Sequence, residues 1–259
     1  MSASRPGWLR RPLWLALLAL AFWGPAAAGA EDPLKIKVGI EPYWPPMEFL
    51  DSGGRIVGFT VDFFQAVARE AGCELEYVEV PWDDIFTGLK DGRWDMVVSS
   101  VTITPERRKE MNFSIPYYIV RQSLLAPASS SLASQRQLKG LKVGFQDDTT
   151  AALVVARSGT LAAPYPTIEE AVAALAKDEV AAVICEDVVA QSFLANPEYS
   201  GRIKMAAVIE TPGAEELYAA AFRPDDLDLM IRINDGIKAV LDKGLDKEIR
   251  GRWFSGTAR

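Results

Sequence analysis

Arg107 is the side chain whose type and position most directly suggest a chemistry. It lies in the segment 99–118, SSVTITPERRKEMNFSIPYY, three residues after Thr104. Thr104 is a favoured N-cap type and Pro105 suits a first helical position, so we expect Arg107 in the first turn of a helix. The helix dipole disfavours a cation there, but a guanidinium beside free N–H groups can hold a carboxylate through two hydrogen bonds. The alternative is a solvated surface arginine, as we interpret Arg108.

Trp44 and Trp82 form a second candidate pair. Both lie in proline-flanked loops just after predicted strands, which is an unusual place for a large core ring. Their indoles can stack on a ligand or hold a cation over the ring face. The alternative is that each ring packs only on its own part of the protein. Trp94, within a predicted strand, is expected in the core.

The composition excludes several kinds of site. The sequence contains no histidine, which removes His-based catalytic triads and the usual zinc-protease motifs. It also has no Walker loop and no dinucleotide-binding fingerprint. The two cysteines, Cys73 and Cys185, are expected to be buried free thiols. We therefore predict neither a metal nor a cofactor.

The first thirty residues have the pattern of a cleaved secretory signal peptide. Arg5, Arg10 and Arg11 precede an apolar run over 12–23, and Ala28-Gly29-Ala30 resembles a cleavage site. The run is shorter than the roughly 20 residues that span a bilayer. No cysteine follows it directly, so we expect no lipid anchor.

The mature chain is acidic. Once the three arginines of the signal peptide are removed, 25 basic residues stand against 35 acidic ones, a net charge of −10. This charge argues against nucleic acid or an anionic membrane surface as the main partner.

The elements that must position the candidate residues alternate between strand and helix, the pattern of an α/β protein. The first series is predicted as strands 35–40, 75–80 and 94–99 with helices 59–71 and 83–89. After a loop over 127–135, the second series comprises strands 141–145 and 180–185, helices 149–157 and 187–195, and a helix N-capped by Thr167 with Glu170 in a capping box. Two helices, 225–241 and 245–253, close the chain. Ligands of such sheets bind at the carboxyl ends of the strands.

Several segments in order along the chain resemble family 3 of the bacterial extracellular solute-binding proteins. They are GFTVDFFQAVA, GRWDMVVSSVTITPERRKEMNFSIPYY, VGFQDDTT and the terminal RWFSG. The family comprises periplasmic receptors of ATP-driven amino-acid importers. The resemblance implies a two-lobed periplasmic-binding-protein fold of type II, in which two strands cross at the hinge. It implies lobe one over 31–121 and 222–259, and lobe two, with the hinge strands at its ends, over 122–221.

The resemblance also implies roles for residues of lobe one. The arginine of the family's T-x-x-R motif, which clamps the α-carboxylate of the ligand, falls on Arg107. The groups that receive the ligand's amino and carboxylate groups fall on Ser99, Ser100 and Thr102. The aromatic residues that enclose the ligand fall on Trp44 and Trp82. Glu41 matches a position that reads a polar or cationic ligand side chain.

In lobe two, this sequence departs from the family pattern at two places. Gln146, Thr149 and Thr150 match the turn that faces the ligand, but Asp148 stands where the family has glycine. Asp148 could N-cap the next helix or repel a carboxylate. The family aspartate that binds the ligand's ammonium is replaced by Glu186. Asp187 could take that role if the register slips by one, although we favour it as an N-cap.

These implications give a predicted function and two alternatives. We predict a monomeric periplasmic receptor without enzymatic activity, which closes on an amino acid or similar solute and delivers it to the permease of an ABC importer. The acidic cleft gives a modest preference for a cationic or polar ligand. One alternative is an enzyme resembling periplasmic dehydratases. The other is a sensory module for a separate receptor, because the chain ends at Arg259 without a membrane span.

Overall fold

The computed structural model describes residues 1, 3, 33–209 and 216–254. The apolar run and the cleavage site of the predicted signal peptide lie outside the described residues. None of the described helices is long and apolar enough to cross a membrane.

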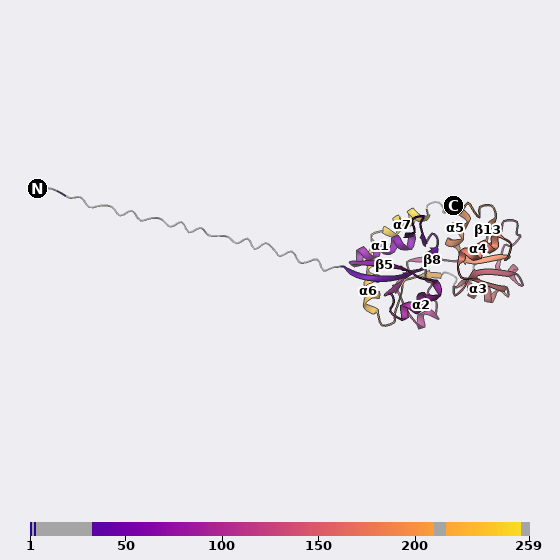
Figure 1. The fold of residues 1–259 in the computed structure, drawn as a ribbon, viewed down its shortest axis with the longest axis horizontal. Helices are drawn as coiled ribbons and strands as arrows, with labels where there is room; N and C mark the ends of the chain where they lie inside the picture. The colour runs from indigo at the N-terminus through magenta and orange to yellow at the C-terminus, as the bar shows by residue number, and fades with distance from the viewer. Residues whose placement is uncertain (2, 4–32, 210–215, 255–259) are drawn as a thin grey trace. The chain divides into compact units, whose positions relative to one another are not determined.

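The sheet of lobe one joins strands from both ends of the chain, in the order β5-β1-β6-β15-β7. β1 (Leu34–Ile40) pairs in parallel with β5 (Cys73–Glu79) and β6 (Met96–Val97). β15 (Ala221–Phe222) runs antiparallel between β6 and β7 (Asn112–Phe113). Lobe one is therefore discontinuous in sequence, and Figure 1 shows the indigo and yellow parts of the chain together in it.

Four α-helices cover this sheet, and the pattern of buried residues separates its two faces. Along the chain they are α1 (Phe59–Ala71), α2 (Trp82–Lys90), α6 (Leu227–Asp242) and α7 (Leu245–Phe254). Met96 packs with the cluster of α1 and α6, whereas Val97 packs with that of α2. Successive strand residues point to opposite faces, so α2 lies on the other side of the sheet from α1 and α6. Helix α1 ends as predicted, with Gly72 in the left-handed region at φ 65°.

Trp94 lies in the core, but it precedes a strand much shorter than the predicted 94–99. Its indole is 3% exposed and donates a hydrogen bond of 2.9 Å to the Ile85 carbonyl. The ring fills the space beside Gly39 and Gly88, where a Cβ would come within 2.7 Å and 2.0 Å of it. Only Met96 and Val97 join the ladder as a strand.

The sheet of lobe two has the order β11-β10-β12-β9-β13. β10 pairs in parallel with β11 and β12, and β9 runs antiparallel between β12 and β13. These strands are β9 (Gln122–Pro127), β10 (Lys142–Gln146), β11 (Leu161–Tyr165), β12 (Ala182–Glu186) and β13 (Ile203–Val208).

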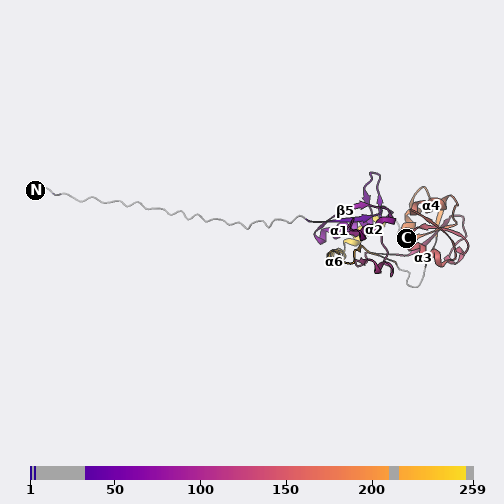
Figure 2. The same cartoon turned by 60° about the horizontal axis from the view of Figure 1, so that its bottom comes forward.

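Helices cover both faces of this sheet, which explains the continuous apolar run of β12. Ala182 and Ile184 pack in the cluster of α3 (Ala151–Arg157). Val183 and Cys185 pack in that of α4 (Ile168–Ala176) and α5 (Asp187–Ala195). Figure 2 shows α3 and α4 on opposite sides of these strands. Two expectations are confirmed: the Thr167 hydroxyl accepts a 3.3 Å hydrogen bond from the Glu170 N–H, and both cysteines are free and buried.

Two strands link the lobes. β8 (Tyr118–Val120) pairs antiparallel with β14 (Glu216–Tyr218), and each leads from one sheet toward the other. This is the two-lobed fold with crossing hinge strands. The exact lobe boundaries remain a prediction. The remaining elements are a small sheet of β2 (Tyr43–Trp44), β3 (Glu48–Leu50) and β4 (Ile56–Val57), and two 3-10 turns, Arg107–Lys109 and Gln135–Leu138.

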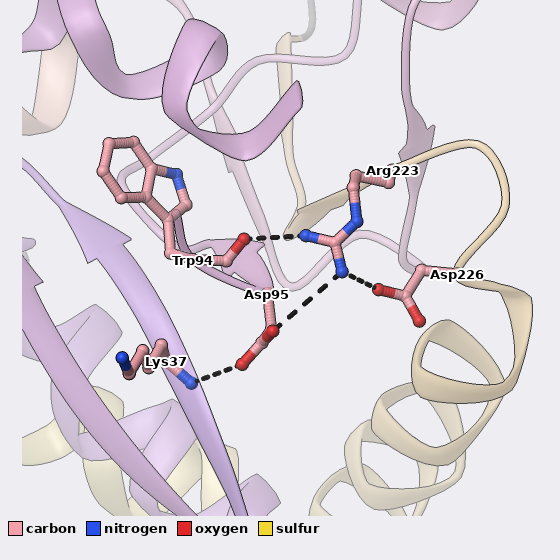
Figure 3. Close-up of polar contacts among 5 residues, drawn as sticks. All are labelled: Lys37, Trp94, Asp95, Arg223 and Asp226. Carbon is pink, nitrogen blue, oxygen red and sulfur yellow. Dashed lines mark hydrogen bonds and ion pairs between the residues drawn. The ribbon is translucent and has the colours of Figure 1, made fainter. Parts of the chain in front are cut away.

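Arg223 fastens the returning chain to lobe one (Figure 3). Its guanidinium donates to the Trp94 carbonyl at 2.8 Å and pairs with Asp226 at 2.5 Å and Asp95 at 3.9 Å. Asp95 in turn accepts a 2.8 Å hydrogen bond from the Lys37 N–H. The start of α6 is thereby tied to β1 and to the segment before β6.

Candidate functional site

All the predicted ligand-binding residues line one cavity. Lobe one contributes its loops after β1 and β6 and the start of α2, and lobe two contributes the ends of β10 and β12. The lining residues are Glu41, Trp44, Glu48, Trp82, Ser99, Ser100, Thr102, Arg107, Gln146, Thr149, Thr150 and Glu186. The cavity thus lies where the carboxyl ends of parallel strands meet, as such sheets favour. The roles of these residues toward a ligand stay predictions.

Arg107 lies at the start of a single 3-10 turn, not in the first turn of an α-helix as the sequence suggested. The Thr104 hydroxyl accepts a hydrogen bond from the Arg107 N–H at 3.1 Å, which is the predicted capping contact. The guanidinium donates to the Thr102 carbonyl at 3.0 Å and to the Asp148 carbonyl of lobe two at 3.1 Å. It also lies 4.9 Å from the Phe86 ring centroid and 5.4 Å from that of Trp82.

These contacts fix the orientation of the Arg107 guanidinium and leave some of its N–H groups available to a ligand. Two of its five N–H donors are used by the carbonyls, and the aromatic faces hold the plane. Burial lowers the pKa of Arg107, with the charge of Asp148 acting in the opposite direction. A desolvated cation with free donors at a cavity wall can bind an anion.

The Ser99-Ser100 segment turns sharply as it leaves β6. Ser100 has φ 46°, a left-handed conformation that is uncommon for a residue other than glycine. Its hydroxyl donates to the Glu48 carboxyl at 3.0 Å, and that of Ser99 accepts from the Glu41 N–H at 3.0 Å. Backbone strain of this kind is found at functional sites, where the surrounding structure holds it.

Trp44 and Trp82 both line the cavity and are 7% and 8% exposed. The Trp44 indole donates to the Tyr218 hydroxyl at 3.3 Å. The Trp82 indole donates across the lobes to the Asp148 carbonyl at 3.2 Å. Each ring therefore packs in the protein and also presents surface to the cavity. Whether the rings stack on a ligand stays a prediction.

The turn after β10 explains the departure from the family glycine. Asp148 has φ 54°, the left-handed region in which glycine is most favourable and aspartate is tolerated. Its side chain does not N-cap α3, because the N-cap position is Thr150 and no side-chain cap is formed there. The Asp148 carbonyl instead accepts the hydrogen bonds of Trp82 and Arg107 from lobe one. Beside it, the Thr149 hydroxyl donates to the Gln146 carbonyl at 2.7 Å.

Glu41 and Glu186 are buried carboxyl groups from opposite lobes. Burial raises the pKa of Glu41 to about 7, although it accepts hydrogen bonds of 3.1 Å and 3.3 Å from the Gln146 amide. Burial, and then the charge of Glu216, raises the pKa of Glu186 to about 8. Glu186 Oε2 has no hydrogen-bond partner among the described residues. Such a group is ready for a donor from a ligand.

Glu186 lines the cavity, whereas Asp187 is occupied elsewhere. The Asp187 carboxylate accepts hydrogen bonds from the Val188 N–H at 2.9 Å and from the Arg121 N–H at 3.3 Å. Asp187 is the first residue of α5 and Glu186 its N-cap position, one residue earlier than the sequence suggested. The geometry favours Glu186 over Asp187 as the acceptor for a ligand.

Sequence reasoning missed three polar residues at or beside the cavity. Glu48 lies in its wall, is fully buried, and has a pKa raised well above the ordinary value by that burial. Gln122 and Glu216 lie where the hinge strands meet the lobes and hydrogen-bond to each other. A signal for Glu48 existed, since a carboxylate in an otherwise apolar strand, EFL, needs a partner. Nothing local marked Gln122 or Glu216.

Comparison with known proteins agrees with this fold. Residues 36–256 match the family model of the bacterial extracellular solute-binding proteins, family 3. The chain belongs to this family of solute-binding proteins.

Its relatives are amino-acid-binding proteins. The chain is similar to the arginine-binding extracellular protein ArtP of Bacillus subtilis (strain 168), with 30% identity over 94% of this chain and 98% of the relative. It is 25% identical to the ABC transporter arginine-binding protein 1 of Escherichia coli (strain K12), over 95% of this chain and 99% of the relative.

The solved structures that are similar to this chain include further amino-acid-binding proteins. The arginine-, lysine-, histidine-binding protein ArtJ from Geobacillus stearothermophilus matches with a TM-score of 0.79 and 30% identity, over 85% of this chain and 95% of that one. The ancestral amino-acid-binding protein AncCDT-1, a precursor of cyclohexadienyl dehydratase, matches with a TM-score of 0.76 and 26% identity, over 85% and 95%.

Proposed function

We propose that this protein is the solute-binding component of an ABC importer for a basic amino acid such as arginine. The observation that carries the proposal is the charge of the cavity. Among the described lining residues, Arg107 shares the cavity with two glutamates that can pair with a ligand cation, Glu41 on lobe one and Glu186 on lobe two. Such a wall suits a solute with one carboxylate and two positive groups. The names of the relatives ArtP and ArtJ support the same ligand class.

The proposed pose follows from where the charges lie. The ligand carboxylate binds the free donors of Arg107, and its ammonium binds Glu186 on lobe two. The side-chain cation binds Glu41, with the rings of Trp44 and Trp82 enclosing the aliphatic part. Glu48 stays protonated behind Ser100, since burial keeps its pKa high.

Ligand binding and lobe closure are then one process. Lobe one already contacts lobe two through Trp82 and Arg107 on the Asp148 carbonyl, and through Glu41 on Gln146. A ligand that binds Arg107 and Glu186 together adds contacts available only when the lobes are closed. It shifts the population to the closed form, the form that a permease can recognise.

Titration calorimetry of the mature protein against L-arginine, L-lysine, L-histidine and L-glutamine tests this function. We expect binding at one site, with arginine tighter than glutamine. Arg107→Ala should weaken arginine binding by about 100-fold or more, because it removes the partner of a buried carboxylate. Arg108→Ala, which removes an exposed neighbouring charge, should leave it unchanged. The assignment fails if no amino acid binds, or if Arg107→Ala binds arginine as tightly as the parent.

We propose that the protein binds its ligand without converting it, although one observation favours a test for enzymatic activity. Glu186 is a buried acid with a pKa near 8 at the cavity wall, as a general acid requires. The match to AncCDT-1 adds a reason, because that binding protein is a dehydratase precursor. Incubation with prephenate or arogenate should give no product. Product that is lost in Glu186→Gln would establish an enzyme instead.

Export and the limits of the lobes belong to the same proposal. We expect a monomeric periplasmic protein that begins at Glu31 after cleavage, with lobe one over 31–121 and 222–259. N-terminal sequencing of the protein recovered from the periplasm checks the cleavage, and light scattering checks the monomer.

A further inference from the structure

Glu216, at the start of hinge strand β14, is surrounded by hydrogen-bond donors. Its Oε2 accepts from the Thr150 hydroxyl at 2.6 Å and from the Thr102 hydroxyl at 3.2 Å. The Gln122 amide donates to both carboxylate oxygens at 3.2 Å. Every one of these partners donates, so the carboxylate acts purely as an acceptor.

The donors come from both lobes and from the hinge. Thr102 follows β6 in lobe one, Thr150 precedes α3 in lobe two, and Gln122 begins β9. Glu216 itself pairs with Val120 where the two hinge strands meet. One carboxylate therefore ties the lobes together, and opening of the cleft must break its bond to Thr102 or its bond to Thr150.

This arrangement makes Thr102 and Thr150 hydrogen-bond acceptors toward a ligand, whereas the sequence suggested that they donate to its carboxylate. A hydroxyl carries one proton, and here Thr102 and Thr150 both give theirs to Glu216. Both threonines line the cavity, where their oxygens can then offer only lone pairs. The Thr150 oxygen already accepts from the Gln122 amide at 3.1 Å. While both bonds to Glu216 hold, the two threonines can accept a further hydrogen bond from a ligand but do not donate one to its carboxylate. The α-carboxylate is left to Arg107 and to main-chain N–H groups.

The negative charge of Glu216 also favours a cationic ligand over an anionic one. It is the second cause, after burial, of the raised pKa of Glu186. A second carboxylate on the ligand would meet this field, whereas a cation would relieve it.

We propose that Glu216 is a specificity-determining positioning residue: it ties the lobes through Thr102 and Thr150 and holds their hydroxyls as acceptors, so that the cleft selects cationic over anionic amino acids. The selectivity part rests on the function proposed above. The tie between the lobes does not.

Glu216→Gln tests the selectivity, with Glu76→Gln on the exposed side of β5 as a control that removes the same charge. Dissociation constants for L-arginine and L-glutamate are measured by calorimetry. In Glu216→Gln, we expect the preference for arginine over glutamate to fall by about tenfold or more, since one charge is lost and the neutral amide oxygen holds the hydroxyl protons less strongly than a carboxylate. Glu76→Gln should keep the parental preference. An unchanged preference in Glu216→Gln overturns the proposal, as a purely structural residue would weaken both ligands equally.

A double-mutant cycle identifies the route of the effect. If Glu216 acts through Thr150, the combination of Glu216→Gln with Thr150→Val should change the preference little more than either variant alone. Fully additive effects contradict that route. Thermal unfolding of each variant confirms that it is folded.

Small-angle scattering of the ligand-free protein tests the tie independently of any ligand. We expect a larger radius of gyration for Glu216→Gln than for the parent or Glu76→Gln, because a neutral amide holds the two threonine hydroxyls more weakly than the carboxylate does. Identical radii overturn the tie. If the parent binds no amino acid, the proposed function fails, and the scattering still decides on the tie.

Discussion

At the scale of single residues, Glu41 and Glu186 make the cleft sensitive to pH. Burial raises their pKa to about 7 and about 8, and that of Glu169, which faces Glu41, to about 7. A protonated carboxyl must lose its proton before it can pair with a ligand cation. Arginine binding should therefore strengthen between about pH 6 and pH 8 and release protons. Calorimetry in two buffers of different ionisation enthalpy measures the release, and Glu41→Gln with Glu186→Gln should flatten the pH dependence. Binding that is independent of pH over this range would contradict the assignment.

The same groups determine whether the stability of the ligand-free protein rises or falls with pH. Their pKa values are higher in the folded state than the ordinary glutamate pKa of 4.5, so the folded state holds the extra protons. Their contribution to the free energy of unfolding is fully present below about pH 4.5. It is lost as the pH rises from there through 7 to 8. We expect the ligand-free melting temperature to fall over that interval and arginine to restore it. Thermal scans with and without arginine at each pH check this, and a parallel fall with saturating arginine would contradict it.

At the scale of secondary-structure elements, the packing of α2 on Trp94 leaves no room for a side chain at Gly88. A Cβ there would lie 2.0 Å from the indole, so Gly88→Ala should lower the free energy of unfolding by about 1–3 kcal/mol through overpacking. Gly251 in α7 has nothing within 4 Å of its Cβ position. Gly251→Ala should be neutral or stabilising by up to about 1 kcal/mol. Denaturant unfolding compares the two, and equal effects would show that Trp94 moves aside.

The elements also show where sequence patterns are reliable. The periodicity of α1 predicts its bounds correctly, because the helix has one apolar face and Gly72 ends it. The predicted bounds of α5 are also correct, but its N-cap is Glu186 and not Asp187. The strand predicted over 94–99 is too long, since an apolar run indicates burial and not pairing. The expected helix at Arg107 is a single 3-10 turn. Thr104 does cap it, but the chain then leaves for β7 before an α-helix can form.

At the scale of the whole molecule, Trp82 links the lobes through the Asp148 carbonyl. Trp82→Phe keeps an aromatic ring and removes this hydrogen bond. We expect arginine, lysine and glutamine to bind more weakly by the same factor, roughly three- to tenfold, because closure costs more for every ligand. Calorimetry measures the factors. If only arginine and lysine are weakened, Trp82 acts through its contact with the ligand's cation and not through closure.

The sequence alone determined the α/β class, the family resemblance and every residue of the cavity wall except Glu48. These follow from local periodicity and from short motifs such as T-x-x-R, whose chemistry does not depend on distant partners. Only the tertiary structure decided what those residues are able to do. It placed Glu216, 114 positions after Thr102, on that threonine's hydroxyl, and it put Asp148 in a left-handed turn with its carbonyl toward lobe one. Burial raised the pKa of Glu186, and burial, like the direction of a hydroxyl proton, depends on contacts between segments far apart in the chain.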